Sequence, residues 1–190
     1  YIQSTPLQLC MMTAQIANGG YAIKPKIIVD SNPISYEDAK QSMESGLLFD
    51  SNSDALLDKK LFKDKKNIKI IQEAMFSSTN ERFGTSYKSR IDDPKYQFAG
   101  KTGTAQVKRI SKRERELDLE LEQIPYKDRD HALYVAYGPY INPRYALSII
   151  VEHGGSGSKA AAPIAKELFK LIIDRHELRN KQSNFERITI

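Results

Sequence analysis

The sequence predicts an α+β fold in which a short antiparallel sheet is covered by helices. Runs typical of strands extend from Tyr96 to Ala99, continuing into Thr104 to Val107, and over His131 to Tyr137 and Tyr145 to Glu152. Only the turn Pro139 to Arg144 separates the last two runs, so we expect them to pair antiparallel. Helical patterns precede and follow these runs, which predicts helices packed against the sheet.

A first helix is indicated near the start of the chain. Thr5 is a suitable N-cap, Pro6 suits the first helical position, and Gly19-Gly20 ends the pattern. Three apolar residues lie on one face of this helix, namely Leu9, Met12 and Ile16. After it we expect a short extended segment, Ile23 to Val29, and a variable loop from Ser31 to Asp58.

Apolar residues at helical spacing predict two further helices. One covers Asn67 to Ser77, and the other covers Lys159 to Arg175 with Ser158 as its N-cap. Their expected buried stripes are Ile68, Ile71 and Met75 in the first helix, and Ile164, Leu168, Leu171 and Ile172 in the second. The final residues, Asn180 to Ile190, look like a loose tail, so we expect residues 1–179 to form the folded part.

Length and composition favour a single globular domain. With 190 residues, of which 40% are hydrophobic, the chain can bury one sizeable core. The net charge of +5 comes largely from the mixed-sign tracts Lys59 to Lys69 and Lys108 to Arg129. Such tracts are typical of solvated surfaces, so no nucleic-acid partner is expected. Within the second tract, the spacing of Leu117, Leu121 and Ile124 predicts a short amphipathic helix.

Cysteine and histidine usage gives no indication of a metal site. The single cysteine, Cys10, excludes an internal disulfide and is expected to be a buried structural thiol. His131, His153 and His176 are too scattered along the sequence to suggest a zinc site. We therefore expect no metal site. No run approaches the roughly 20 apolar residues of a membrane span.

The most informative short motif is Lys101-Thr102-Gly103, followed by Thr104. It stands in a strand-like run, where the lysine supplies a positive field. Thr102 and Thr104 are two positions apart, which places their hydroxyls on one face of a strand. Gly103 has no side chain and lets a substrate backbone approach closely. The four residues are therefore candidates for holding an anionic peptide against a sheet edge.

The residues alone leave two further roles open for this triplet. It can be a solvated strand end closed by a turn, because a triplet of this kind arises by chance in chains of this length. It can also be the tail of a phosphate loop, since Gly100-Lys101-Thr102 matches the end of G-x-x-x-x-G-K-[ST]. Against the phosphate loop, Lys95 stands where that motif needs its first glycine, and Gly103 and Thr104 are poor residues for opening a helix.

Further motifs follow the triplet in a fixed order. After KTGTAQV (101–107) come HALYVAYG (131–138), YALSIIVE (145–152), the glycine-rich HGGSG (153–157) and Ala161-Ala162-Pro163. Together with the opening YIQSTP and Asn18-Gly19-Gly20, this order resembles the C-terminal part of the transpeptidase domain of class B penicillin-binding proteins, of the penicillin-binding protein 2 type. The resemblance implies the three C-terminal strands of a penicillin-binding or serine β-lactamase-like fold, incomplete in this chain.

The same resemblance implies a peptidoglycan D,D-transpeptidase that acts in cell-wall synthesis. In the family a serine attacks the bond between two D-alanines of the stem peptide, and β-lactams acylate the same serine. Lys101 would attract the substrate carboxylate, Thr102 and Thr104 would hydrogen-bond it, and the backbone N–H of Thr104 would form half of the oxyanion hole. No cofactor is implied. The implied partners are membrane proteins of cell elongation, and the implied location is the periplasmic face of the bacterial inner membrane.

The nucleophilic serine is expected to lie outside this sequence. In the family, S-x-x-K and S-x-N both precede the triplet. Here Ser156-Gly157-Ser158-Lys159 follows it, and Ser78-Thr79-Asn80 ends a helical pattern, so we expect both matches to be coincidental. The chain is thus expected to be a piece of an enzyme, inactive by itself, with the anchor of the parent protein elsewhere. The alternative is a non-catalytic protein-interaction module of the same fold. In isolation, we expect self-association through an unpaired edge at Tyr145 to Glu152, or else a rearrangement of Tyr1 to Val29 that covers this edge.

Overall fold

The computed structural model describes residues 3–23, 25, 60–108 and 119–188. Most of the predicted segment Ile23 to Val29, the predicted loop Ser31 to Asp58 and the helix position Leu117 lie outside these residues. The described chain contains one sheet, three α-helices and several short helical turns.

The strands form one antiparallel sheet in sequence order. β1 covers Ala99–Ala105, β2 covers His131–Gly138 and β3 covers Tyr145–Val151, with β2 between the other two. The turn at 139–144 keeps β2 and β3 adjacent, as predicted. The predicted α+β class with an antiparallel sheet is confirmed. In the described part of the chain, β1 and β3 each pair only with β2, so the sheet is open at both outer edges.

β1 is shorter at both ends than the sequence predicted. Before it, Asp93 forms a turn, because its carboxylate accepts the N–H of Lys95 at 2.9 Å and its carbonyl accepts the N–H of Tyr96 at 3.0 Å. Tyr96 therefore belongs to this turn and the strand begins at Ala99. Beyond Ala105, the N–H of Val107 donates to the Asp130 carboxylate at 3.1 Å, so this residue no longer takes part in the ladder.

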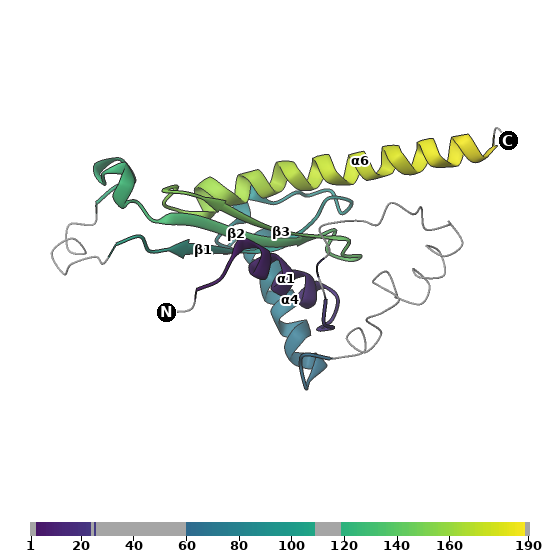
Figure 1. The fold of residues 1–190 in the computed structure, drawn as a ribbon, viewed down its shortest axis with the longest axis horizontal. Coiled ribbons are helices and arrows are strands. Elements are labelled where there is room, and N and C mark those ends of the chain that lie inside the picture. The colour runs from purple at the N-terminus through teal and green to yellow at the C-terminus, as the bar shows by residue number, and fades with distance from the viewer. Residues whose placement is uncertain (1–2, 24, 26–59, 109–118, 189–190) are drawn as a thin grey trace.

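Helices cover both faces of the sheet (Figure 1). The long helix α6, Ala162–Ile188, lies along one face, and α1, Pro6–Ala17, and α4, Lys65–Asn80, lie against the other. α1 begins where predicted, with a capping box between Thr5 and Gln8. α4 extends beyond the predicted Asn67 to Ser77 at both ends.

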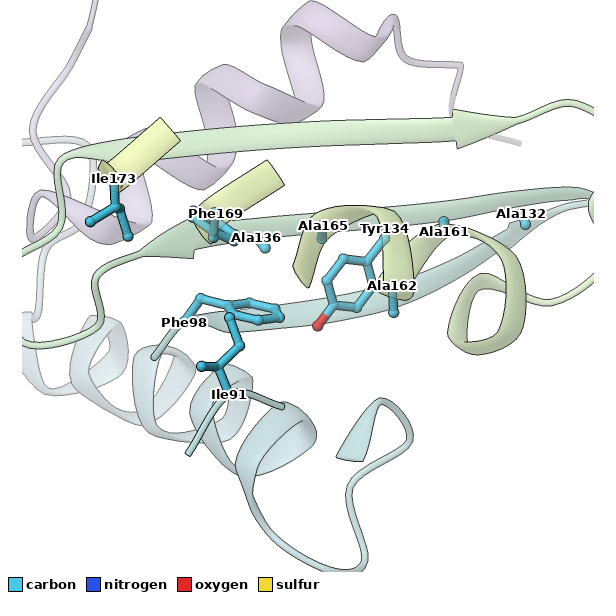
Figure 2. Packing of buried hydrophobic residues seen from close by; sticks show 10 residues of the cluster. All are labelled: Ile91, Phe98, Ala132, Tyr134, Ala136, Ala161, Ala162, Ala165, Phe169 and Ile173. Atoms are coloured by element: carbon cyan, nitrogen blue, oxygen red, sulfur yellow. The ribbon is translucent and has the colours of Figure 1, made fainter. Parts of the chain in front are cut away.

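The larger core lies between the sheet and α6 (Figure 2). Phe98, just before β1, stacks on Phe169 of α6 with ring centroids 4.8 Å apart, and meets Tyr134 of β2 edge-on at 6.4 Å. The other buried members are Ile91, Ala132, Ala136, Ala161, Ala162, Ala165 and Ile173. On the opposite face, a smaller core joins Ile16 of α1 and Met75 of α4 to Ala99 and Tyr137.

The face that α6 buries differs from the predicted one. Phe169 is fully buried, while Ile164 and Leu171 are 43% and 64% exposed. The other two residues of the predicted stripe, Leu168 and Ile172, are half-buried. The buried stripe instead runs through Ala161, Ala165, Phe169 and Ile173. The reason is steric, since the aromatic rings of Phe98 and Tyr134 on the sheet leave room only for alanine over most of the contact.

The N-terminal part of α6 lies directly on the sheet backbone. A π-helical turn, Gly157–Ala161, precedes α6 with Ser156 at the N-cap position, so the prediction of Ser158 as N-cap was wrong. A Cβ on Gly157 would lie 2.3 Å from the carbonyl oxygen of Leu133 and 2.7 Å from that of Gly103. Only glycine allows this close approach of the turn to the sheet.

At its other end, α6 continues through most of the predicted tail. The backbone is helical to Ile188, so the loose tail predicted from Asn180 is wrong for these residues. The segment contains no glycine or proline, and it includes four residues that favour helix, namely Lys181, Gln182, Glu186 and Arg187. Figure 1 shows this part of α6 extending past the sheet.

The described part of the charged insertion forms no α-helix. Leu121–Gln123 and Tyr126–Asp128 are single 3-10 turns on either side of Pro125, which interrupts regular helix. Leu121 packs on the glycine-rich turn after β3, since a Cβ on Gly155 would lie 2.5 Å from a Leu121 methyl carbon. The insertion is thereby fixed against the end of the sheet.

The open edge of β3 leads to a prediction for the isolated chain. An unpaired β-branched strand is a template for another chain, so we expect the wild type to elute above 21.6 kDa at about 100 μM. Ile150, which is 37% exposed, is a suitable position for a charged side chain that opposes pairing of this edge with another chain. Ile150→Lys should shift the mass toward the monomer, whereas Ile164→Lys on α6 should not. Light scattering coupled to size exclusion measures both, and a monomeric wild type would refute the prediction.

Candidate active-site strand

The predicted motif residues lie on β1, at the open edge of the sheet. Lys101 and Thr104 are exposed, while Thr102 and Gly103 are half-buried. The ladder to β2 places Lys101 opposite Val135 and Thr104 opposite Ala132. Because only one side of β1 is paired in the described chain, its other side offers backbone groups and these side chains to an extended ligand. The structure therefore brings all four predicted residues together on one accessible strand.

A chain of hydroxyl groups extends from the lysine toward helix α4. The Lys101 ammonium donates to the carbonyl of Thr102 at 2.9 Å and approaches the Thr102 hydroxyl at 3.3 Å. The Thr102 hydroxyl lies 3.4 Å from that of Thr85, which in turn lies 3.3 Å from that of Ser78. Thr85 and Ser78 were not predicted as site residues. Little in the sequence indicated their role, because only the tertiary fold brings them close to β1.

Thr85 is positioned by a tight turn after α4. The N–H of Ser86 donates to the carbonyl of Ser78 at 3.0 Å, which folds the chain back on the helix end. A Cβ on Gly84 would lie 2.3 Å from the same carbonyl oxygen, so the turn needs glycine there. Asn80, in the last turn of α4, also donates to the carbonyl of Phe98 at 2.9 Å. This turn is thus fixed to both the helix and the segment entering β1.

A buried tyrosine of β2 also holds this turn. Tyr134 is directly opposite Thr102 in the ladder, and its hydroxyl lies 2.9 Å from that of Thr79 and 3.0 Å from that of Ser86. A Cβ on Gly100 would lie 2.4 Å from this hydroxyl, so the ring occupies the space over the glycine. Burial raises the pKa of Tyr134, against the opposing effect of these hydrogen bonds. The neutral phenol therefore links β1, α4 and the turn.

The ladder excludes the phosphate loop that the sequence left open. In a phosphate loop the lysine and hydroxyl residues open a helix. Here Lys101 and Thr102 lie in the middle of β1, which continues to Ala105, and the described residues 106–108 that follow are not helical.

Comparison with known proteins identifies the fold. Residues 2–170 match the family described as the penicillin binding protein transpeptidase domain. The chain belongs to this transpeptidase domain family. The MrdA peptidoglycan D,D-transpeptidase of Haemophilus influenzae is 28% identical over 180 residues, which is 92% of this chain and 24% of that protein. The chain spans between 16% and 24% of the length of the first MrdA relatives it matches.

Solved transpeptidases of the same type share the arrangement of strands and helices. Pseudomonas aeruginosa PBP2 superposes with a TM-score of 0.62 at 30% identity, covering 90% of this chain and 31% of that one. Helicobacter pylori PBP2, solved as a complex with MreC, superposes with a TM-score of 0.56 at 28% identity, covering 88% of this chain and 25% of that one. These similarities confirm the PBP2-type transpeptidase domain that the ordered motifs indicated.

The structure places both serine matches near the ends of helical segments. The Ser156 hydroxyl is 3.0 Å from that of Ser158, at the beginning of the π-helical turn, and among the described side chains no hydrogen bond joins it to the Lys159 amine. Ser78 lies in the last turn of α4 and contacts Thr85. Thr79, the middle residue of the second match, is buried against Tyr134.

Two of the three histidines, which are far apart in the sequence, lie together in the fold. The N–H of His153 donates to Nδ1 of His131 at 2.9 Å, and the two ring centroids are 4.8 Å apart. His176 lies elsewhere, against Tyr145. Across the described ranges no group of three or more histidine, cysteine, aspartate or glutamate side chains could hold a metal.

Cys10 packs between α1 and β3, less deeply than the buried thiol that the sequence predicted. It is half-buried, its thiol donates to the carbonyl of Ala146 at 3.4 Å, and burial raises its pKa. The helix that carries it is too short to span a membrane, and none of the described helices is both long and apolar enough for a crossing.

Proposed function

We propose that this chain supplies the substrate-binding strand of a peptidoglycan D,D-transpeptidase. The observation that carries the proposal is the position of Lys101, Thr102 and Thr104 on the open edge of β1, with the Thr102 hydroxyl between Lys101 and Thr85. An extended stem peptide can add to this edge as a further strand. Its terminal carboxylate would receive hydrogen bonds from the Thr102 and Thr104 hydroxyls and lie in the positive field of Lys101.

The reaction would proceed by acyl transfer. A serine attacks the carbonyl between the two terminal D-alanines, the developing oxyanion accepts a hydrogen bond from the backbone N–H of Thr104, and the last D-alanine leaves. An amine of a second stem then attacks the acyl-enzyme and forms the cross-link. β-Lactams would follow the first half of this path. Gly103 lets the peptide backbone approach the strand closely.

We assign the nucleophile to residues outside these 190. The surroundings of Ser156 and Ser78 lack a lysine amine within hydrogen-bonding reach among the described side chains, which S-x-x-K chemistry requires. This chain alone is accordingly proposed to be inactive. The complex of the Helicobacter pylori relative with MreC supports a cell-elongation partner for the parent protein, and a periplasmic location of the domain fits its proposed substrate.

A chimera tests the proposal. The 190 residues would replace the aligned C-terminal part of Pseudomonas aeruginosa PBP2. The retained part of that protein would supply the serine motif. We expect the chimera to be acylated by a fluorescent penicillin. Lys101→Ala should lower the acylation rate about 10- to 100-fold, because a charge-assisted contact contributes roughly 1.5 to 3 kcal/mol.

A lysine elsewhere on the surface provides the control. Lys95 lies 2.8 Å from Glu177 and 3.1 Å from Asp174, next to α6, and Lys95→Ala should leave the acylation rate within about twofold. Equal rates for Lys101→Ala and the parent chimera would reject the role of the triplet. A folded chimera that is not acylated at all would favour the alternative, a non-catalytic interaction module.

A further inference from the structure

A groove of about 620 Å³ lies between the turn after α4 and the beginning of α6. One wall is the turn after α4, including Thr85, and the other is the beginning of α6 with the π-helical turn before it. Thr85 belongs both to this groove and to the hydroxyl chain that ends at Lys101, since its hydroxyl lies 3.4 Å from that of Thr102. Through this contact of Thr85, the groove adjoins β1.

The lining of the groove carries an excess of positive charge. Four cationic side chains line it, namely Arg82, Lys88, Lys159 and Lys166, against the single carboxylate of Glu167. Among the residues that the structure describes, none of the four cations forms an ion pair within 4.0 Å, and Glu167 lies 3.9 Å from Lys170 outside the groove. By contrast, neighbouring Arg90 is engaged with Asp92 at 2.9 Å. A concave surface lined by charges of one sign concentrates oppositely charged ligands.

We propose that this groove binds the side-chain carboxylates of an acidic peptide whose backbone lies along β1. The inference rests on the proposed function in one respect, that a peptide occupies the β1 edge. Two features favour a peptide over a nucleic acid. The groove adjoins a strand edge that can pair with an extended backbone, and hydroxyls of Thr85 and Ser158 among its lining suit carboxylate oxygens. Binding in this groove would make acidic side chains of the peptide a determinant of substrate choice.

The test compares two fluorescent pentapeptides that both end in D-Ala-D-Ala. One carries two glutamates and the other two glutamines at the same positions. By fluorescence anisotropy with the 190-residue chain, we expect the acidic peptide to bind about 5- to 20-fold more tightly at low salt, with the difference shrinking as salt rises. In the double variant Lys159→Gln/Lys166→Gln, this difference should disappear, while the affinity for the glutamine peptide stays the same.

Lys170→Gln is the matched control, because Lys170 lies on the same helix but outside the groove. It should retain the preference, and circular dichroism should give similar melting temperatures for all variants. Equal binding of the two peptides, or equal effects of the double variant and the control, would overturn the inference. A single-stranded DNA of equal charge that binds more tightly than the acidic peptide, and loses binding in the double variant, would also overturn it.

Lys101→Ala separates this inference from the proposed function. If both hold, Lys101→Ala weakens both peptides and leaves the preference for the acidic one. If Lys101→Ala weakens both peptides but the two bind equally in wild type, the strand role stands and the groove role fails. If the acidic preference depends on Lys159 and Lys166 while Lys101→Ala changes nothing, the groove binds acidic peptides and the proposed role of the strand fails.

Discussion

Phe169→Ala should lower the free energy of unfolding of the chain by about 3–5 kcal/mol. Phe169 is fully buried and its ring stacks on Phe98 with centroids 4.8 Å apart, so truncation leaves a cavity at the centre of the contact between α6 and the sheet. Several of the buried neighbours in this cluster are alanines, whose short side chains have no other rotamer that could fill the cavity. Urea unfolding followed by circular dichroism measures the loss.

Leu171→Ala is the matched control for this prediction. Leu171 belongs to the stripe that the sequence placed against the sheet, but it is 64% exposed. We therefore expect its truncation to change the free energy of unfolding by no more than about 0.5 kcal/mol. If the leucine variant lost as much stability as the phenylalanine variant, the orientation of α6 described above would be incorrect.

Gly157→Ala should also destabilise the chain, by about 1–3 kcal/mol, and should disturb the candidate strand directly. The added methyl would lie 2.3 Å from the Leu133 carbonyl oxygen and 2.7 Å from that of Gly103, and these are backbone atoms that cannot rotate away. The π-helical turn must move off the sheet, or β1 and β2 must move with it. Faster amide hydrogen exchange at Gly103 and its neighbours, together with urea unfolding, would report the change.

Ser158→Ala is the control variant for Gly157→Ala. Ser158 is half-buried, and its hydroxyl contacts only that of Ser156, at 3.0 Å, among the described groups. We expect a loss of about 1 kcal/mol or less and unchanged exchange at Gly103. A Gly157→Ala chain as stable as wild type, with β1 exchange unaltered, would mean that the close approach is not required.

Local patterns in the sequence were sufficient to predict the three strands, the cores of the three α-helices and the pairing of β2 with β3. The Thr5 cap, the Gly19-Gly20 helix end and the short 139–144 connection each act through neighbouring residues, and each was located correctly. The orientation of α6 was not predictable in this way, because the helix carries apolar residues on two faces. Small alanines on the buried face gave a weaker hydrophobic signal than the leucines on the exposed one.

The candidate site was likewise predictable only where it is local. Lys101 to Thr104 form one contiguous motif that could be read from the sequence. Thr85 and the groove beside it depend on the turn after α4 reaching β1, and the contact between His131 and His153 depends on where β2 and the turn after β3 lie. Such contacts join residues distant in sequence, so no spacing rule indicates them.

The most direct test of β1 as the substrate-binding strand maps where a substrate-like peptide contacts this chain. A pentapeptide ending in D-Ala-D-Ala would be titrated into the ¹⁵N-labelled chain, with amide chemical shifts recorded residue by residue. We predict that the largest shifts fall on Lys101 to Thr104 of β1 and are lost in Lys101→Ala. Shifts concentrated on Tyr145 to Val151 of β3, or none on β1 at saturating peptide, would contradict the assignment of β1 as that strand.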